Sequence, residues 1–193
     1  MKMGNFEKRL VNSPSHSQQV SQHAERLLNL IDVAAGQTYL DVGCGNGSAA
    51  IHLARKYQLK VTGIDVDPDQ IRLAQKQSQS LTQVHFHTID GTCLPFSDGT
   101  FDIVFTNKVT HHIPTWRAAL TEMLRMVKHG GHFIYNDLVF PPPLAKAGEA
   151  LVGNWFGFPT QREVETILQK QGFVSIHRTF STVQFEGVFK RVG

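Results

Sequence analysis

The stretch Tyr39-Leu-Asp-Val-Gly-Cys-Gly-Asn-Gly-Ser48 decides the fold of this chain. An apolar run leads into three glycines at alternate positions, and a helical pattern of apolar residues begins at Ser48. A strand, a glycine-rich turn and a helix in this order direct backbone N–H groups toward an anionic ligand group. Glycine also tolerates a positive φ and lets a ligand approach the backbone closely. The stretch therefore predicts a nucleotide-type pocket.

Size and composition indicate one globular domain spanning residues 1–193. Hydrophobic residues make up 41% of the chain and charged residues 18%, as in ordinary soluble proteins. No long apolar run or signal-type N-terminus is present, and the two cysteines are expected to be reduced, so the expected location is the cytoplasm. The formal charge of +3 comes from scattered basic residues, which does not favour a nucleic-acid partner.

Strand and helix patterns alternate on both sides of the glycine turn. Alternating runs at 174–180 and 183–189 predict a C-terminal antiparallel hairpin. Asp67 is expected to cap the helix that starts at Pro68. The other predicted strands lie at 38–42, 60–64, 84–89, 101–107 and 131–137, and the predicted helices lie at 15–31, from 48, 68–79, 115–127 and 160–170.

Two motifs resemble those of the class I S-adenosylmethionine (SAM) methyltransferases. Asp41 and the glycines follow the pattern acidic-x-G-x-G-x-G. The stretch Leu94-Pro-Phe-Ser-Asp-Gly-Thr-Phe-Asp-Ile-Val104 is similar to the L-P-F-x-D-x-x-F-D-x-V segment of the type 11 members, which are related to ubiquinone and menaquinone biosynthesis methylases. The resemblance covers nearly the whole chain. It implies an α/β fold with a Rossmann-like, seven-stranded, mostly parallel sheet, helices on both faces and an antiparallel C-terminal hairpin.

The resemblance also implies where SAM is held. Asp65 leaves the second parallel strand, where a carboxylate can accept from both hydroxyls of a ribose. Asp90 matches the acidic residue that accepts from the adenine amino group; without the family it would be a turn residue. The implied cofactor-binding residues are Asp41, Gly43, Cys44, Gly45, Asn46, Gly47, Asp65, Val66, Asp90, Gly91, Thr92 and Asn107.

Methyl transfer from a sulfonium is an in-line displacement, and positioning can lower its barrier by about 7–11 kcal/mol without a strong base. If the acceptor loses a proton, the candidate bases are His112, which we favour, and His111, with Tyr135 and Asp137 behind them. The alternative role for these histidines is a hydrogen bond to a backbone carbonyl. His85 and His87 share one strand face, but no third ligand accompanies them, so no metal site is predicted.

Two segments carry open alternatives. Residues 1–35 are expected to form an N-terminal helical lid, with Ser15 capping its helix, or else a helix that packs on the sheet edge. Residues 139–159 fit no regular element because three prolines precede a run of aromatic residues. This segment is expected to line the acceptor pocket as a loop, although Trp155, Phe156 and Phe158 could instead fill the core.

The sequence therefore predicts a SAM-dependent methyltransferase that acts on a small-molecule acceptor and releases S-adenosylhomocysteine (SAH). The acceptor atom is left open. We expect a monomer or homodimer without a nucleic-acid or membrane partner. One alternative is a non-catalytic SAM- or SAH-binding sensor or partner protein. An NAD(P)-dependent oxidoreductase fits less well, because its fingerprint needs the wider spacing G-x-G-x-x-G.

Overall fold

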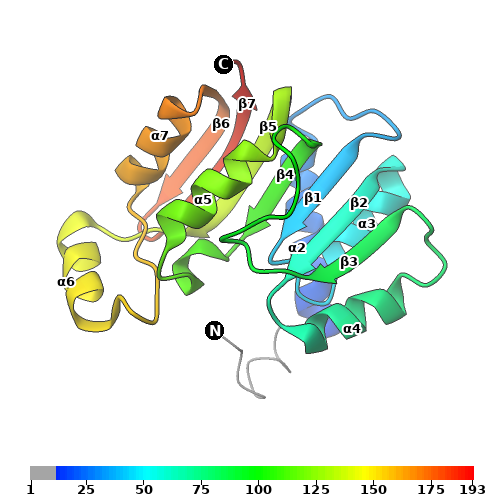
Figure 1. The fold of residues 1–193 in the computed structure, drawn as a ribbon, viewed down its shortest axis with the longest axis horizontal. Helices are drawn as coiled ribbons and strands as arrows, with labels where there is room; N and C mark the ends of the chain where they lie inside the picture. The colour runs from blue at the N-terminus through cyan, green and yellow to red at the C-terminus, as the bar shows by residue number, and fades with distance from the viewer. Residues whose placement is uncertain (1–11) are drawn as a thin grey trace.

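A single mixed sheet organises the structure, a computed structural model that describes residues 12–193. Its strands run in the order β3-β2-β1-β4-β5-β7-β6 (Figure 1). The first five strands of the chain pair in parallel, and β7 pairs antiparallel with both β5 and β6. This arrangement confirms the predicted fold class. The strands are β1 Thr38–Val42, β2 Lys60–Asp65, β3 Val84–Thr88, β4 Phe101–Asn107, β5 Val127–Leu138, β6 Phe173–Ser181 and β7 Gln184–Arg191.

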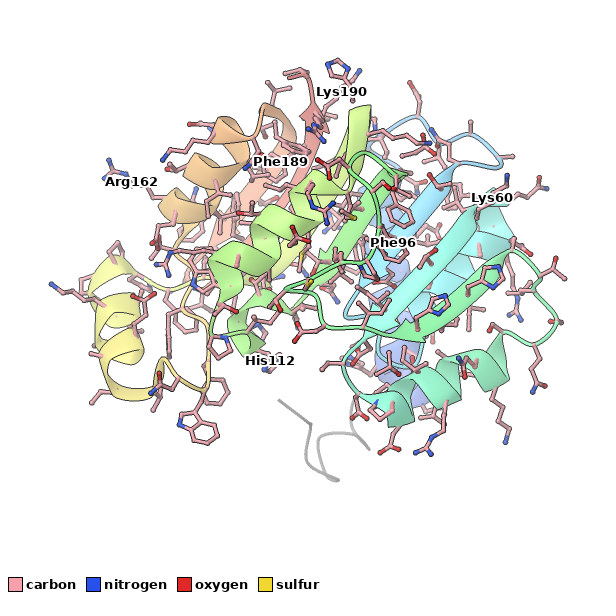
Figure 2. All side chains as sticks on the ribbon, in the orientation of Figure 1. Lys60, Phe96, His112, Arg162, Phe189 and Lys190 are labelled. Atoms are coloured by element: carbon pink, nitrogen blue, oxygen red, sulfur yellow. The ribbon has the colours of Figure 1, made fainter. Side chains whose placement is uncertain are left out.

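Helices cover both faces of this sheet (Figure 1). Residues of α2, α3 and α4 pack in a core cluster on one face, and residues of α5 and α7 pack in a second cluster on the other. Charged side chains such as Lys60, Arg162 and Lys190 lie at the periphery, whereas Phe189 is buried (Figure 2). The helices are α2 Pro14–Leu28, α3 Ser48–Tyr57, α4 Pro68–Gln77, α5 Trp116–Arg125, α6 Pro142–Val152 and α7 Gln161–Lys170, with a short 3₁₀ turn, η1, at Thr110–His112.

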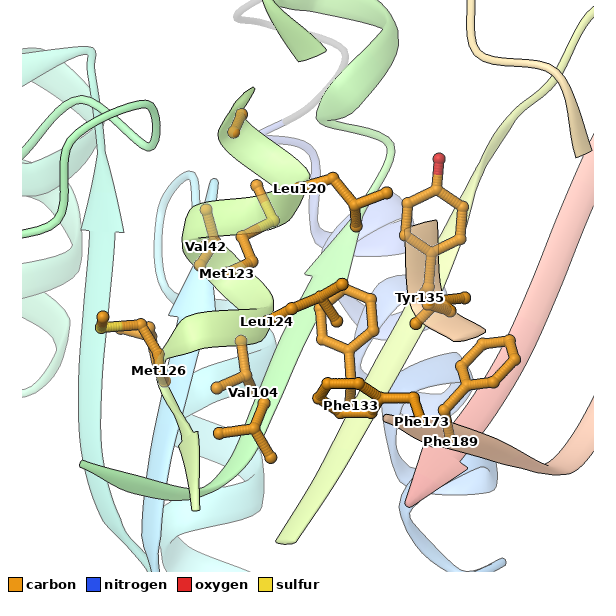
Figure 3. Close-up of a cluster of buried hydrophobic side chains, with 14 of the residues drawn as sticks. Val42, Val104, Leu120, Met123, Leu124, Met126, Phe133, Tyr135, Phe173 and Phe189 are labelled. Carbon is orange, nitrogen blue, oxygen red and sulfur yellow. The ribbon is translucent and has the colours of Figure 1, made fainter. Parts of the chain in front are cut away.

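The α5 side of the sheet is held by close apolar packing (Figure 3). Leu120, Met123 and Leu124 of α5 are at most 1% exposed and belong to the same cluster as Val104 and Phe133 of the sheet. Strands buried on both faces are expected in a parallel sheet covered by helices. This packing fixes α5, and with it the η1 turn that precedes α5, against the carboxyl ends of β4 and β5.

Strand order reverses beside β1. The chain leaves β1 toward β2 on one side, and β4 later pairs with β1 on the other. In open α/β sheets, ligands bind at the carboxyl ends of the strands beside such a reversal. The glycine turn follows β1 at this point, so the predicted pocket lies where the topology favours one.

Several predicted boundaries are wrong. The N-cap of α2 is Ser13, whose Oγ accepts from His16 N at 3.3 Å, because the helix starts at Pro14 and not at Ser15. Strand β5 starts at Val127, inside the predicted helix, and an irregularity in its pairing with β4 accommodates Gly130 and Gly131.

The segment at 139–159 was also predicted wrongly, because it contains the helix α6. Pro142 and Pro143 occupy the first turn of α6. Backbone N–H groups there make no intrahelical hydrogen bond, so proline, which has no N–H, is tolerated. The prolines therefore start this helix instead of preventing it. Trp155 does not fill the core, since it is 67% exposed.

The predicted cap of α4 is confirmed, because Asp67 accepts from Asp69 N at 2.9 Å. The structure adds a cap for α7, where Thr160 accepts from Glu163 N at 3.3 Å. Asp102 is structural: its Oδ2 accepts from Thr38 N at 2.8 Å and so ties the starts of β1 and β4 together.

Candidate active site

The three glycines of the turn after β1 differ in what surrounds them. Gly43, Gly45 and Gly47 have φ of 74°, 53° and 75°. A Cβ on Gly43 would lie 2.2 Å from Val109 Cγ2, and one on Gly47 would lie 2.6 Å from Phe86 Cζ. A Cβ on Gly45 would meet no atom within 4 Å. Gly43 and Gly47 therefore serve packing, whereas Gly45 presents bare backbone to open space.

Two carboxyl groups flank this open backbone. Asp65, at the end of β2, accepts from Gly45 N at 2.9 Å and from Asp67 N at 2.8 Å. Burial raises the pKa of Asp65, although these N–H groups oppose the change. Asp41 is 3% exposed, and burial together with the charge of Asp65 raises its pKa to about 7. Desolvated carboxyls this close together favour a positively charged ligand, because a nearby cation stabilises their ionised forms.

Cys44 and Asn46 have structural contacts within the turn. Burial raises the pKa of the Cys44 thiol well above its ordinary value, which is the opposite of what a nucleophilic thiol needs. Asn46 Oδ1 accepts from Ser48 N at 3.1 Å, and its Nδ2 donates to Ser17 Oγ of α2 at 3.2 Å. Asn46 thus connects α2 to the turn, while Leu27 and the rest of the apolar face of α2 pack on the sheet.

The residues expected at the adenine lie on the far side of Asp65. Strand β3 pairs with β2 through Asp65 and Thr88, so Asp90 follows at the same edge of the sheet. The exposed Asp90 accepts from Thr92 N at 2.9 Å and from Thr92 Oγ1 at 2.8 Å. Val66 is 48% exposed. Asp41 in β1, Asp65 at the end of β2 and Asp90 just after β3 therefore lie on adjacent strands or next to them, at one edge of the sheet.

Gly91 and Asn107 complete the expected cofactor set. A Cβ on Gly91 would lie 3.3 Å from Val42 Cγ1, so the chain passes close to the end of β1 there. Asn107 Oδ1 accepts from Asn136 Nδ2 at 2.6 Å, and Asn136 Oδ1 accepts from Gln184 Nε2 at 2.7 Å. This chain of amides fixes Asn107 at the carboxyl end of β4.

The histidines lie beyond Asn107, and one of them has a buried carboxylate partner. His111 Nδ1 hydrogen-bonds to Asp137 Oδ1, and the side chain of Asp137 has no exposed surface. Asp137 Oδ2 also accepts from Val109 N at 2.9 Å and from Thr110 N at 2.6 Å. The His111 side chain is 14% exposed. Asp137 is thus fixed by several donors and in turn orients the imidazole.

His112 lies next to this pair, at the edge of the sheet where the strands end (Figure 2). The ring centroids of His111 and His112 are 3.9 Å apart. The structure therefore shows a carboxylate partner for His111, whereas the sequence favoured His112 as the general base. Alternation along β5 is a signal that could have indicated this, because Tyr135 and Asp137 share the strand face that is covered by α5.

Two further observations concern the described residues only. Within residues 12–193 no three His, Cys, Asp or Glu side chains gather in a way that could hold a metal ion. None of the helices in that range combines the length and apolar character needed to cross a bilayer.

The fold and this edge define a class I methyltransferase type of α/β domain. Residues 40–135 match the family model described as "Methyltransferase domain". The O-methyltransferase rstn1 of Aspergillus nomiae is 33% identical over 153 residues, which cover 75% of this chain and 67% of that protein. The chain belongs to this methyltransferase family.

Solved structures with the same fold have low sequence identity. A geranyl diphosphate methyltransferase solved in complex with SAM is 16% identical, with a TM-score of 0.76 over 94% of this chain and 92% of that one. The [4+2]-cyclase SpnF is 18% identical, with a TM-score of 0.77 over 91% and 82%. The chain spans 32–67% of the length of the curated relatives compared, and about half in several cases.

Proposed function

We propose that this chain is a SAM-dependent methyltransferase that transfers a methyl group to a small-molecule acceptor and releases SAH. The observation that carries the proposal is the open backbone at Gly45, whose N–H donates to the half-buried Asp65 carboxyl, with the buried Asp41 carboxyl near Asp65. SAM fits these residues because it combines a ribose, an adenine and positive charge. Bound SAM supplies a methyl group already activated on a positively charged sulfur.

Each expected residue then has a distinct task. Asp65 accepts from the ribose hydroxyls, because a carboxylate has about four lone-pair sites and its two backbone donors leave room for more. Asp90 accepts from the adenine amino group, and Val66 offers the ring an apolar contact. Asp41 stabilises the positive end of the ligand. The N–H groups of the glycine turn and Asn107 complete this half of the site.

His111 is the proposed general base, and Asp137 is a positioning residue. Because the Asp137 carboxylate accepts from Nδ1–H, the neutral imidazole carries its acceptor lone pair on Nε2. Nε2 can then remove the proton from an acceptor hydroxyl as the methyl group is transferred. An acceptor with an ionisable proton, such as a hydroxyl, makes the best use of this arrangement.

The remaining assignments are also proposals. Of the lid expected at residues 1–35, the described part, residues 12–35, covers the cofactor, which the contact between Ser17 and Asn46 supports, and residues 1–11 lie outside the described residues. The free thiols of Cys44 and Cys93 are compatible with a cytoplasmic location. We propose a monomer or homodimer whose partner is the small-molecule acceptor, and neither a nucleic acid nor a membrane.

A second candidate is a SAM- or SAH-binding protein that does not transfer a methyl group. This chain has the same fold as a [4+2]-cyclase, and one fold can carry unrelated chemistry. The fold alone therefore does not require methyl transfer, and the second candidate is retained.

Thermal unfolding with SAM, SAH and NAD tests the cofactor. A ligand present at 100 times its Kd stabilises the folded state by about 2.7 kcal/mol, which raises the midpoint by several degrees. We expect SAM and SAH to raise it and NAD to leave it unchanged. The reverse result would overturn the proposal. Labelled SAM incubated with a metabolite extract then separates the two candidates, since only an enzyme transfers the label.

A further inference from the structure

Helix α6 and the residues after it expose an unusual amount of apolar surface. Among the eleven residues of α6 only Ala145 is buried, while Leu144 is 57% exposed and Leu151 is 83% exposed. Trp155 follows at 67%. An apolar surface of this kind, gathered in one segment, commonly marks a binding site.

Few charged side chains accompany this exposed apolar surface. Lys146 and Glu149 are the charged residues of α6, and Glu149 is neutralised by Arg117 Nη2 at 3.0 Å. Apart from Asn154, the other exposed side chains from Pro142 to Trp155 are aliphatic or aromatic. The surface is therefore suited to an uncharged, hydrophobic group.

The same segment is fixed against the proposed general base. Gly157 N donates to the backbone oxygen of His111 at 2.9 Å. A Cβ on Gly157 would lie 2.4 Å from Thr110 O and 2.5 Å from Ile113 O, so only glycine permits this approach. Consecutive Cα atoms are about 3.8 Å apart, which places the Trp155 backbone within about 8 Å of this anchor.

Half-buried apolar residues fill the interval between the anchor and α6. Phe156 and Ile113 are half-buried on either side of the Gly157 contact. The Phe158 ring packs on Phe140, with centroids 5.1 Å apart, and contacts α6 at Gly148. The apolar surface thus continues from the His111 segment outward to the exposed helix, which follows β5 in the chain and projects from the sheet below α7 (Figure 1).

We propose that Ile113, Leu144, Leu151, Trp155 and Phe156 form an acceptor face, which binds the hydrophobic part of a lipophilic acceptor. The reactive hydroxyl of this acceptor reaches His111 while its alkyl or ring portion lies along α6. This inference rests on the proposed function and specifies its substrate class. Continuity with the His111 segment favours a small-molecule acceptor over a second copy of the chain or a bilayer, neither of which has to reach the base.

A series of phenols tests the acceptor face. Isothermal titration calorimetry with SAH present would measure the Kd of 4-alkylphenols from 4-ethylphenol to 4-hexylphenol. Each buried methylene is worth about 0.8 kcal/mol, so the affinity of the unmodified protein should rise about fourfold per added carbon. Leu151→Ser and Trp155→Ser should flatten this dependence. Both side chains are exposed, so neither change removes core packing.

Leu30→Ser is the matched control. Leu30 is 40% exposed and follows the C-terminal end of α2, whereas Ser17 near the other end of that helix contacts the glycine turn. The control should keep the full chain-length dependence. The acceptor face would be overturned if affinity rose equally per added carbon in all variants, or if it did not depend on chain length in the unmodified protein.

Further outcomes separate this inference from its alternatives. If SAM raises the unfolding midpoint but the affinity for phenols does not depend on the length of their alkyl chain, the acceptor face is wrong and the cofactor assignment stands. If neither SAM nor SAH changes the midpoint, the proposed function itself fails. A dimer that Trp155→Ser converts to a monomer in sedimentation would assign this surface to a second copy. Co-sedimentation with phosphatidylcholine vesicles that Trp155→Ser abolishes would assign it to a bilayer.

Discussion

The two halves of the carboxyl edge are built in different ways. The half formed by β1, β2 and β3 depends mainly on a short continuous motif, which holds the buried Asp41 carboxyl and a glycine turn whose open position is Gly45. The half formed by β4, β5 and α6 depends on contacts between distant residues, such as His111 with Asp137 and Gly157 with His111. The first half suits a fixed cofactor. In the proposed function the second half binds the acceptor, and α6 can vary there with little loss of core packing, because it contributes only Ala145 to the core.

The largest expected effect is a loss of catalytic rate in the acceptor half that leaves SAM binding in the cofactor half unchanged. His111→Gln should lower kcat about 10²- to 10⁴-fold, the usual contribution of a general base, while the Kd for SAM stays unchanged. Single-turnover transfer of labelled methyl groups and titration with SAH would measure the two quantities. His112→Gln is the control and should retain most of the activity. If His112→Gln were the more damaging change, the proposed role of the pair formed by His111 and Asp137 would be wrong.

A second prediction concerns the cofactor half alone and describes how the unfolding free energy depends on pH. The pKa of Asp41 is about 7 in the folded protein, against an ordinary value of 3.8. A carboxyl with a raised pKa favours the folded state when it is protonated, so the unfolding free energy should fall as pH rises from about 4 to about 7. A change of about 3 pKa units corresponds to about 4 kcal/mol as an upper value.

Asp41→Asn should remove most of this pH dependence and make the ligand-free protein more stable than the original at pH 8. Urea unfolding at several pH values would measure it. The same substitution should weaken SAM binding, because the ionised Asp41 carboxylate is the form that a cation stabilises. A variant that kept the full slope between pH 4 and 7 would show that another group causes it.

A third, smaller effect tests the open backbone. Gly45→Ala should raise the Kd for SAM about 10- to 100-fold, because the added Cβ occupies space that the cofactor needs and strains a positive φ. Gly130 has φ of 78°, and a Cβ added there would likewise meet nothing within 4 Å, but it lies in the irregular start of β5. Gly130→Ala should therefore lose similar stability, about 1–2 kcal/mol, without changing SAM affinity. Equal SAM affinities in the two variants would remove Gly45 from the binding site.

The same contrast explains how much the sequence could predict. The turn after β1 and the cap at Asp67 follow from local patterns, and the fold follows from the family resemblance together with the alternating elements. The partner of His111 lies 26 residues away, and choosing between His111 and His112 requires the direction of each ring. The helix after Pro141 does not follow from the rule that proline interrupts helices, because at the start of a helix proline is compatible with the geometry.

The smallest expected effect asks whether α2 belongs to the cofactor half. Ser17 Oγ accepts from Asn46 Nδ2 at 3.2 Å and so links α2 to the glycine turn, whereas Leu27 and Leu28 attach α2 to the sheet. Ser17→Ala removes one hydrogen bond worth about 1 kcal/mol, so SAM affinity should fall by no more than about fivefold.

The control for this change is Ser21→Ala, one turn further along α2, where Ser21 Oγ donates to Ser17 O at 2.8 Å. Calorimetric titration with SAM would compare the two. If Ser17→Ala weakens SAM binding and Ser21→Ala does not, α2 helps to hold the turn in its binding conformation. Identical affinities would make α2 a packing helix alone, and the cofactor half would then consist of the strand ends and the glycine turn.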